Sequence, residues 1–265
     1  MIPKIIHYVW VGDQPKPELV YKCINSWKKY CPDFEIREWG NDSLLKISNR
    51  YVLQAIEHKK WAFVSDYIRL YALYNYGGLY LDSDCEITAP VYEFLKYSYV
   101  TGNEKSKRPI TAFLGSEPAN ATIKDLLDEY NKLEMFDNTG EPDFTTNTER
   151  ITKYFKTKYS LKTPVEDTEP FFFGENSVIF PSYYFCTPAE GKKNYAIHHF
   201  AYSWQTSFKR RLLLRVGNFK FVKFSQKIFP AKETLPLTEN EKIVCKIHIG
   251  TRYFCITYTK SKVND

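Results

Sequence analysis

The chain has 265 residues, of which 43% are hydrophobic and 17% aromatic, so it can bury the core of one large α/β domain. No run approaches 18 apolar residues and no basic-then-apolar leader opens the chain, so we expect neither a transmembrane span nor a signal peptide. The six cysteines show no metal-type C-x-x-C spacing and are expected to be reduced thiols. The net charge of +6 is unevenly placed, because residues 205–265 carry 13 basic and 4 acidic side chains.

The first 60 residues alternate between strand-like and helix-like segments. Residues 4–11 and 34–39 are predicted as strands, and residues 18–30 and 43–58 have the apolar periodicity of helices. This strand–helix–strand–helix order predicts a parallel, nucleotide-binding half of a sheet. His7, alone inside an apolar strand, is interpreted as a core residue.

The stretch between residues 61 and 86 has the most distinctive pattern in the chain. Residues 61–76 contain no Gly or Pro and repeat apolar side chains at helical spacing, which predicts a helix. The Gly77-Gly78 pair that follows can take the positive φ that ends a helix. Residues 79–81 are then a short apolar run typical of a strand.

Two carboxylates, Asp82 and Asp84, follow this predicted strand. Paired carboxylates at the end of a buried strand are costly unless a cation or water receives them, and a divalent ion shared with substrate phosphates is a common solution. Asp66 and Arg69, at i and i+3, share one face of the preceding helix and place an acceptor and a fixed cation near the acidic turn. The alternative is a solvated Asp-Ser-Asp turn and a surface ion pair.

The region from residue 90 to residue 204 continues the α/β pattern. Residues 90–97, 121–135 and 150–159 are predicted as helices, and residues 111–115 and 171–182 as strands.

The last quarter of the chain differs in composition from the rest. Residues 208–229 contain seven basic side chains and no acidic one, and Lys220, Lys223 and Lys227 fall on one helical stripe opposite an apolar one. This pattern is typical of a helix lying on an anionic membrane, although a basic face packed against the preceding domain would have the same composition. Residues 242–259 are predicted as a β-hairpin.

Three motifs resemble those of glycosyltransferase family 32, which includes capsular-polysaccharide enzymes and yeast initiating mannosyltransferases, with the clostridial glucosylating toxins as distant relatives. The D-x-D region of that family is matched by Ser65, Asp66, Arg69, Leu73, Gly77, Gly78, Tyr80, Asp82 and Asp84. Its opening I-P-K-x-I-H-x-x-W is matched by Ile2, Pro3, Lys4, Ile6, His7 and Trp10, and its closing H-x-x-x-x-S-W by His198, Ser203 and Trp204. The resemblance covers roughly residues 2–204.

The resemblance implies a divalent metal site, for Mn²⁺ or Mg²⁺. Asp84 would be a direct ligand, and Asp82 would bind the metal through water or would contact the ribose. His198 takes the fixed position of the family and would be a further ligand, with His199 as the alternative.

The resemblance also implies a sugar subsite. Asp66 and Arg69 would hold hydroxyls of the transferred sugar, and Tyr80 would lie behind the sugar or the ribose. Asn147, in a region similar to the T-G-P segment of the family, either contacts donor or acceptor or is an ordinary loop residue.

For the nucleotide, the resemblance implies that Trp10 stacks on the base, with Val9 and Gly12 as backbone neighbours. On composition alone, Trp10 would be a core aromatic. Ser203 and Trp204 would close over the donor diphosphate.

We therefore expect a GT-A-like α/β fold with a mixed central sheet over residues 1–204, and a basic aromatic extension over residues 205–265 for membrane or acceptor docking. The expected function is a metal-dependent, retaining glycosyltransferase that moves a hexose or N-acetylhexosamine, with a UDP-sugar favoured as donor. The expected acceptor is a lipid-linked glycan of bacterial surface polysaccharide such as capsule. The expected location is cytoplasmic and peripheral on the inner face of the cell membrane, without nucleic acid as a partner. The alternatives are a non-catalytic nucleotide-sugar- or glycan-binding protein, and a toxin-like protein glycosylator, which the lack of a leader disfavours.

Overall fold

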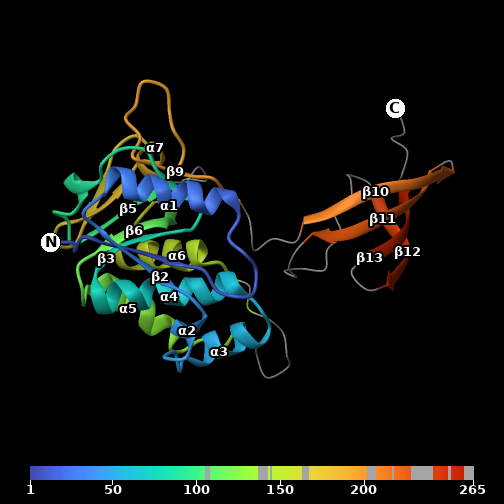
Figure 1. Cartoon of the computed structure of the whole chain (residues 1–265), viewed down its shortest axis with the longest axis horizontal. Helices are drawn as coiled ribbons and strands as arrows, with labels where there is room; N and C mark the ends of the chain where they lie inside the picture. Colours follow the sequence, from blue (N-terminus) through green and yellow to red (C-terminus); the bar gives the residue numbers. More distant parts are fainter. Residues whose placement is uncertain are drawn as a thin grey trace. The chain divides into compact units, whose positions relative to one another are not determined.

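The computed structural model of the chain describes residues 1–104, 108–136, 143, 145–162, 167–201, 207–216, 218–227, 241–249 and 252–259. The chain divides into two compact units, residues 1–201 and 202–265, whose elements are drawn in Figure 1. The expected division after residue 204 lies within residues 202–206, which are outside the described residues.

The first unit alternates strands and helices along the chain. Its helices are α1 (Glu18–Tyr30), α2 (Asn41–Leu44), α3 (Arg50–Glu57), α4 (Trp61–Tyr76), α5 (Ala121–Tyr130), α6 (Asn147–Tyr159) and α7 (Ser182–Phe185), with a 3₁₀ turn η1 (Tyr92–Phe94). Its strands are β1 (Ile5–Val9), β2 (Glu35–Trp39), β3 (Gly78–Leu81), β4 (Cys85–Ile87), β5 (Tyr99–Asn103), β6 (Pro109–Ser116), β7 (Phe171–Phe173), β8 (Ser177–Phe180) and β9 (Ala196–His198).

Seven of these strands form the central sheet, in the order β2-β1-β3-β6-β5-β8-β7. Strand β1 runs parallel to both β2 and β3, whereas β6 is antiparallel to β3 and to β5. The prediction of an α/β fold with a mixed central sheet and a parallel first half is therefore confirmed. Strands β4 and β9 pair separately as a two-stranded antiparallel sheet.

Helices cover both faces of the central sheet. Figure 1 shows α1 and α7 on one side of the sheet and α3, α4, α5 and α6 on the other. Strand β3 is buried on both faces, with Leu79 and Leu81 in the core beneath α1 and Tyr80 in the core shared with α4. The strand that leads into the acidic turn is thus fully enclosed.

Local sequence signals set where the helices begin and end. Helices α1 and α4 cover the predicted residues 18–30 and 61–76, and α4 ends at Gly77, whose φ is +63°. The helical region predicted over residues 43–58 is instead two helices. The second, α3, begins where the Asn49 side chain accepts a hydrogen bond from the backbone of the first turn.

The second unit is a four-stranded antiparallel sheet of β10 (Ser207–Val216), β11 (Phe219–Lys227), β13 (Arg252–Thr259) and β12 (Glu241–Ile249), in that order. The predicted hairpin over residues 242–259 is confirmed by the pairing of β12 with β13.

The predicted membrane helix over residues 208–229 is wrong, because β10 and β11 occupy this segment and pair with each other. Phe, Val and other residues that pack well on a pleated surface favour a strand here. The spacing of Lys220, Lys223 and Lys227 defines a stripe on a helix, but a strand places neighbouring odd and even positions on opposite faces. The helical periodicity on which this expectation rested is therefore absent from β11.

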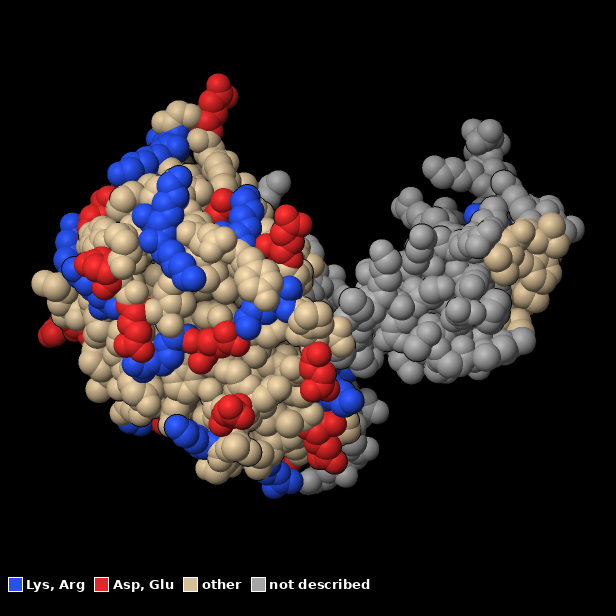
Figure 2. All heavy atoms as spheres, in the orientation of Figure 1, with Lys and Arg blue, Asp and Glu red and all other residues tan. Residues whose placement is uncertain are grey.

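Charges of both signs are mixed over the first unit. In Figure 2, Lys and Arg side chains alternate with Asp and Glu over its visible face, so no broad region of one sign stands out there. Cys23, Cys31, Cys85, Cys186 and Cys245 are free thiols. Within the described parts of the chain, no helix has the length and apolar character needed to cross a membrane.

Candidate active site

The acidic turn lies where the central strand β3 leaves the sheet. Before it, Gly78 adopts φ +101° and passes so close to β1 that a Cβ there would lie 2.6 Å from the carbonyl oxygen of Ile5. After β3, the backbone N–H of Asp82 donates to the carbonyl of Ala112 at 2.9 Å, and the Asp82 carbonyl accepts from the N–H of Cys85 at 2.8 Å. These bonds hold the turn in one conformation and start strand β4.

Asp82 is oriented by two side chains of the enclosed core. The Tyr80 hydroxyl donates to Oδ1 of Asp82 at 3.1 Å, and Nη1 of Arg69 lies 3.3 Å from the same oxygen. The Arg69 guanidinium is 4.6 Å from the centre of the Tyr80 ring, a cation–π distance. One oxygen of Asp82 is therefore held by protein groups.

Arg69 also binds Asp66, as the i and i+3 spacing predicts. Nη2 of Arg69 donates to Oδ1 of Asp66 at 2.8 Å, and Nη1 donates to the carbonyl of Thr111 at 2.9 Å. Burial raises the pKa of Asp66 to about 6, although the charge of Arg69 opposes this shift. The ion pair is enclosed rather than solvated, because only 5% of the Arg69 side chain is exposed.

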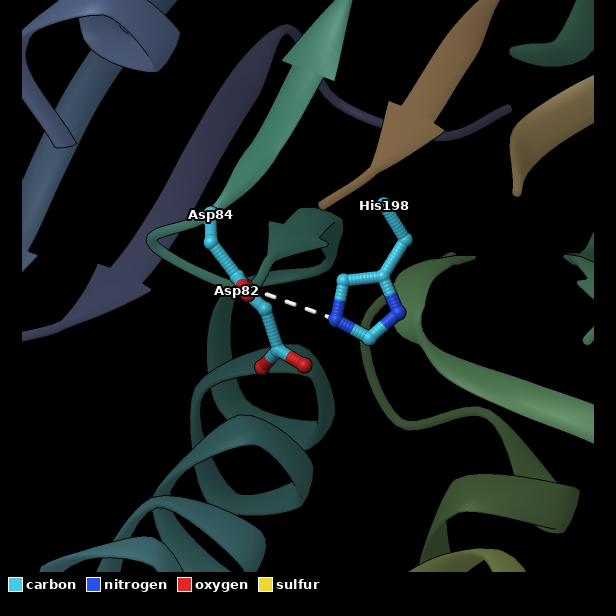
Figure 3. Close-up of side chains that lie close together, drawn as sticks. All are labelled: Asp82, Asp84 and His198. Carbon is cyan, nitrogen blue, oxygen red and sulfur yellow. Dashed lines mark ion pairs between the residues drawn. The ribbon is translucent and has the colours of Figure 1, made fainter. Parts of the chain in front are cut away.

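Asp84 and His198 come together through the pairing of β4 with β9, which places Cys85 opposite His198. Nε2 of His198 lies 3.4 Å from Oδ1 of Asp84, and the backbone N–H of Ala201 donates to Oδ2 of Asp84 at 2.8 Å. Figure 3 shows the imidazole of His198 beside the two aspartates, with its ion pair to Asp84 drawn as a dashed line.

These three residues form a possible metal site. One ligand atom from each of Asp82, Asp84 and His198 lies within 4.8 Å of the others, and each side chain is partly exposed. An octahedral ion with bonds of about 2.0–2.1 Å separates its ligand atoms by ~2.9 to ~4.2 Å, so small adjustments would complete the site. The carboxylate donors suit Mn²⁺ or Mg²⁺, whereas the imidazole donor is a ligand that transition-metal ions prefer.

The neighbouring His199 faces a different group. Its Nε2 lies 2.8 Å from Oε2 of Glu86, which is also bonded to Nζ of Lys22 at 2.7 Å. Of the two histidines weighed from the sequence, His198 is the one that faces both aspartates.

The two carboxylates perturb the titration of His198. Burial lowers the pKa of the His198 imidazole, but hydrogen bonds to Asp84 and Cys186 and the charge of Asp82 outweigh it and raise this pKa to about 10. Burial likewise acts against the charged form of Asp84, whereas its bond to His198 and the Ala201 N–H bring its pKa below the usual value. An imidazolium therefore balances part of the carboxylate charge when no other cation is bound.

The turn after β1 contains the residues predicted to contact the base. Trp10 is half-buried, and its indole N–H donates to the carbonyl of Gln14 at 2.9 Å. Gly12 adopts φ +94° beside the Trp61 indole, and its N–H donates to Oδ1 of Asn41 at 2.8 Å. Val9 is buried, so only its backbone could face a ligand.

The Trp10 turn and the acidic turn follow adjacent parallel strands. Strands β1 and β3 pair through Ile6 with Leu79 and His7 with Tyr80, so the turns that follow them leave the same edge of the sheet. Ligands of open α/β sheets bind at this edge. The sheet thus places the predicted nucleotide and metal residues on one side of the molecule.

Two predicted residues are not covered by the described structure, and one is structural. Ser203 and Trp204 fall outside the described residues. His7 is fully buried, as expected for a core residue, and Trp39 Nε1 donates to its Nδ1 at 3.1 Å. Its Nε2 then carries the proton and donates to the carbonyl of Gly77 at 2.9 Å.

Sequence reasoning missed the contacts made by backbone groups. The N–H of Ala201 on Asp84 and the carbonyl of Thr111 on Arg69 both fix site residues. Because any residue has these groups, no side-chain pattern could have indicated them.

Comparison with known proteins gives a consistent picture. Residues 17–102 match the family described as "Glycosyltransferase sugar-binding region containing DXD motif". An uncharacterized glycosyltransferase of Acanthamoeba polyphaga mimivirus is 27% identical over 180 residues, covering 63% of this chain and 69% of the relative. That relative is viral and gives no support to the expected bacterial origin.

Similar solved structures are also glycosyltransferases. The PaToxG glycosyltransferase matches with a TM-score of 0.45 and 19% identity over 60% of this chain and 70% of its own. A glycosyltransferase involved in glycosylation of the major capsid of PBCV-1 matches with a TM-score of 0.42 and 14% identity over 76% of this chain and 95% of its own.

Proposed function

We propose that this chain transfers a hexose or N-acetylhexosamine from a nucleotide sugar in a metal-dependent reaction, and the match of residues 17–102 to a DXD-containing glycosyltransferase region supports this proposal. The observation that carries the proposal is the convergence of Asp82, Asp84 and His198 at the end of the central strand. A UDP-sugar is the favoured donor and a glycan the acceptor. Retention of configuration is included in the proposal, because the resemblance to retaining enzymes supports it.

A divalent ion at this site would neutralise the diphosphate leaving group as a Lewis acid. Asp84 would bind it through Oδ1, because Ala201 already occupies Oδ2. Asp82 would use the oxygen that Tyr80 and Arg69 leave available, and His198 would bind through Nε2. The remaining positions would be open to phosphate oxygens and water.

The other site residues would position the donor. Trp10 would present its ring face to the base, with Gly12 allowing close approach of the backbone. Asp66 would accept a hydrogen bond from a hydroxyl of the sugar, and Arg69 would donate one. Their enclosed ion pair would hold both side chains in position. These roles leave the acceptor hydroxyl to approach from the side open to solvent.

The experiment measures release of UDP from a panel of UDP-sugars, with GDP-sugars for comparison, in the presence of Mn²⁺ and then of excess chelator. We expect release that needs both the metal and a glycan acceptor. Thermal stabilisation by each nucleotide sugar, measured in parallel, would identify the donor because a ligand of the native state raises its apparent stability. Binding without release under any condition would favour a non-catalytic nucleotide-sugar-binding protein.

For the acceptor, we infer a lipid-linked glycan of surface polysaccharide, reached by docking of residues 205–265 on the anionic inner face of the cell membrane. The support is charge complementarity: this segment carries 13 basic and 4 acidic residues. Its sheet also has exposed apolar side chains, namely Leu213, Leu214, Phe219, Phe221 and Val244. Such side chains can enter the headgroup region while the basic residues attract anionic lipid.

The docking is tested by co-sedimentation with vesicles of anionic or neutral lipid at low and high salt. We expect binding to anionic vesicles that salt weakens. Replacing Lys220, Lys223 and Lys227 by Glu should reduce it, whereas the same change at Lys28, Lys29 and Lys132 of the first unit should not. Equal partitioning to both lipids would contradict the docking and leave the transferase assignment unaffected.

A further inference from the structure

A layer of buried polar side chains lies behind Asp66. Its members come from four different helices and none is more than 7% exposed: Tyr51, Arg69, Tyr130, Asn147 and Arg150. We call this set the polar layer. Of these five residues, only Arg69 belongs to the site described above.

The layer is contiguous. The rings of Tyr51 and Tyr130 meet edge to face with centroids 5.2 Å apart, and the Arg150 guanidinium lies 5.8 Å from the Tyr130 ring. The amide of Asn147 lies beside the carboxylate of Asp66. The hydroxyls of both tyrosines are within electrostatic reach of that same carboxylate.

The start of helix α6 fixes two members of the layer. Thr146 and Glu149 form a capping box, in which the Thr146 hydroxyl accepts from the Glu149 N–H at 3.3 Å and Oε2 of Glu149 accepts from the Thr146 N–H at 3.0 Å. Asn147 is the first residue of this helix and Arg150 follows one turn later. Arg150 is held further by ion pairs to Asp143 and Glu129.

Several polar atoms of the layer lack a partner. Among the residues that the structure describes, no hydrogen bond reaches the hydroxyls of Tyr51 and Tyr130, Nε of Arg69 or Arg150, or the amide oxygen of Asn147. Buried polar groups are almost always paired, and leaving them unpaired costs free energy. Five such atoms in one layer indicate that a polar guest completes it.

The chemistry of the layer selects the kind of guest. Both cations are already paired, Arg69 with Asp66 and Asp82 and Arg150 with Asp143 and Glu129, so a further ion has no counter-charge to bind. The unpaired atoms include donors and acceptors, and a hydroxyl group satisfies both at once. The hydroxyls of a neutral polyhydroxylated ring match this chemistry.

We propose that Tyr51, Tyr130, Asn147 and Arg150 form a specificity-determining layer that binds, directly or through ordered water, the hydroxyls of the sugar ring held by Asp66 and Arg69. The layer distinguishes hexose epimers, because a site built to bond a hydroxyl leaves its own groups unpaired when that hydroxyl points elsewhere. This inference rests on the proposed function, since the ring is that of the donor sugar.

The test measures, by calorimetry with Mn²⁺, the affinities of UDP, UDP-glucose, UDP-galactose, UDP-N-acetylglucosamine and UDP-N-acetylgalactosamine for the full chain. The variants are Tyr51→Phe, Tyr130→Phe and Asn147→Leu, each of which removes hydrogen-bonding atoms at nearly constant volume. Tyr99→Phe is the matched control, because Tyr99 is also fully buried with an unpaired hydroxyl but packs against Phe155 and Phe173 in another part of the core.

We expect the ratio of affinities between epimers to change at least about tenfold in Tyr130→Phe or Asn147→Leu, with UDP affinity unchanged and Tyr99→Phe like wild type. Epimer ratios equal to wild type in all three layer variants would overturn the specificity layer and leave the transferase proposal standing. If wild type binds no nucleotide sugar while Mn²⁺ is present, both proposals fall together. Calorimetry needs no turnover, so a missing acceptor does not obscure the outcome.

Discussion

Nη1 of Arg69 lies 3.3 Å from Oδ1 of Asp82, and this contact joins helix α4 to the acidic turn at the end of β3. The same guanidinium bonds Asp66 at 2.8 Å and the Thr111 carbonyl at 2.9 Å. A single buried cation thus sets the positions of the predicted sugar-binding and metal-binding carboxylates together. A substitution of Arg69 should therefore disturb both carboxylates without removing any proposed metal ligand.

Arg69→Lys is expected to lower the rate of sugar transfer by about 10²-fold, because an ammonium lacks the planar fork that reaches Asp66, Asp82 and Thr111 together. Mn²⁺ affinity should change much less than the rate, since the three proposed ligands remain. The measurement compares UDP release with metal titration. A variant with wild-type transfer would show that this geometry is not needed.

Asp84→Asn is expected to reduce transfer by ~10²–10³-fold or more and to weaken Mn²⁺ binding, because a charged oxygen facing His198 is lost. The fold should survive, since Asp84 lies in a turn and an amide can still accept from Ala201. Asp128→Asn, on the exposed side of α5, is the control. Normal turnover by the folded Asp84 variant, or by wild type in excess chelator, would contradict the metal assignment.

Trp10→Ala is expected to weaken UDP binding by ~1–3 kcal/mol, the usual contribution of base stacking on an aromatic ring. Metal affinity should be unaffected, and Trp10→Phe should retain most of the nucleotide affinity. The exposed Tyr76 offers a control through Tyr76→Ala. If the folded Trp10→Ala protein binds UDP as wild type does, Trp10 is a packing residue only.

The sequence predicted the parts of the site that depend on side-chain type and short-range spacing. Asp66 and Arg69 are three residues apart on one helix, and Asp82 and Asp84 follow a strand whose apolar run is evident. The approach of His198 to Asp84 depends instead on the pairing of β4 with β9 across more than 100 residues, and only the family resemblance indicated it. The members of the polar layer likewise come from four helices, whose packing against one another no local pattern specifies.

Residues 208–229 show where the periodicity of side chains fails to predict the secondary structure. In residues 208–229, the spacing of Lys and Phe fits one stripe of a helix. The same residues are also compatible with the pleated surface of a strand, and the structure has strands β10 and β11 here. A helix would satisfy its own backbone, but pairing of β11 with both β10 and β13 also gives this segment neighbours along its whole length, which an isolated helix would lack.

His7 is expected to make the protein less stable as the pH falls from 6.5 towards 4. Burial lowers the pKa of His7 to about 4, while the unfolded chain keeps the ordinary value of 6.5, so below pH 6.5 the unfolded state binds the extra proton. The loss should reach about 3 kcal/mol at pH 4.

The measurement is urea unfolding of wild type and His7→Gln between pH 4 and pH 7.5. Asp66 acts in the opposite direction, because its pKa is raised and the folded state holds its proton between about pH 4 and pH 6. Only the difference between the two proteins therefore isolates His7. If the difference in unfolding free energy between wild type and His7→Gln does not change with pH, His7 is not held as a neutral imidazole by its two hydrogen bonds.

Gly78→Ala is expected to destabilise the protein far more than Gly191→Ala, although both glycines have positive φ. An alanine at Gly191, with φ +66°, would meet nothing within 4 Å, so only the backbone preference of about 1–2 kcal/mol is lost. At Gly78, with φ +101°, the added Cβ would lie 2.6 Å from the carbonyl oxygen of Ile5 and would push β3 away from β1. We expect this crowding to add about 1–3 kcal/mol to the loss of stability and to lower the rate of sugar transfer, because β3 carries the acidic turn.

Urea unfolding and UDP release would be measured for both variants. Equal destabilisation would show that the contact between these two strands can relax without moving the site.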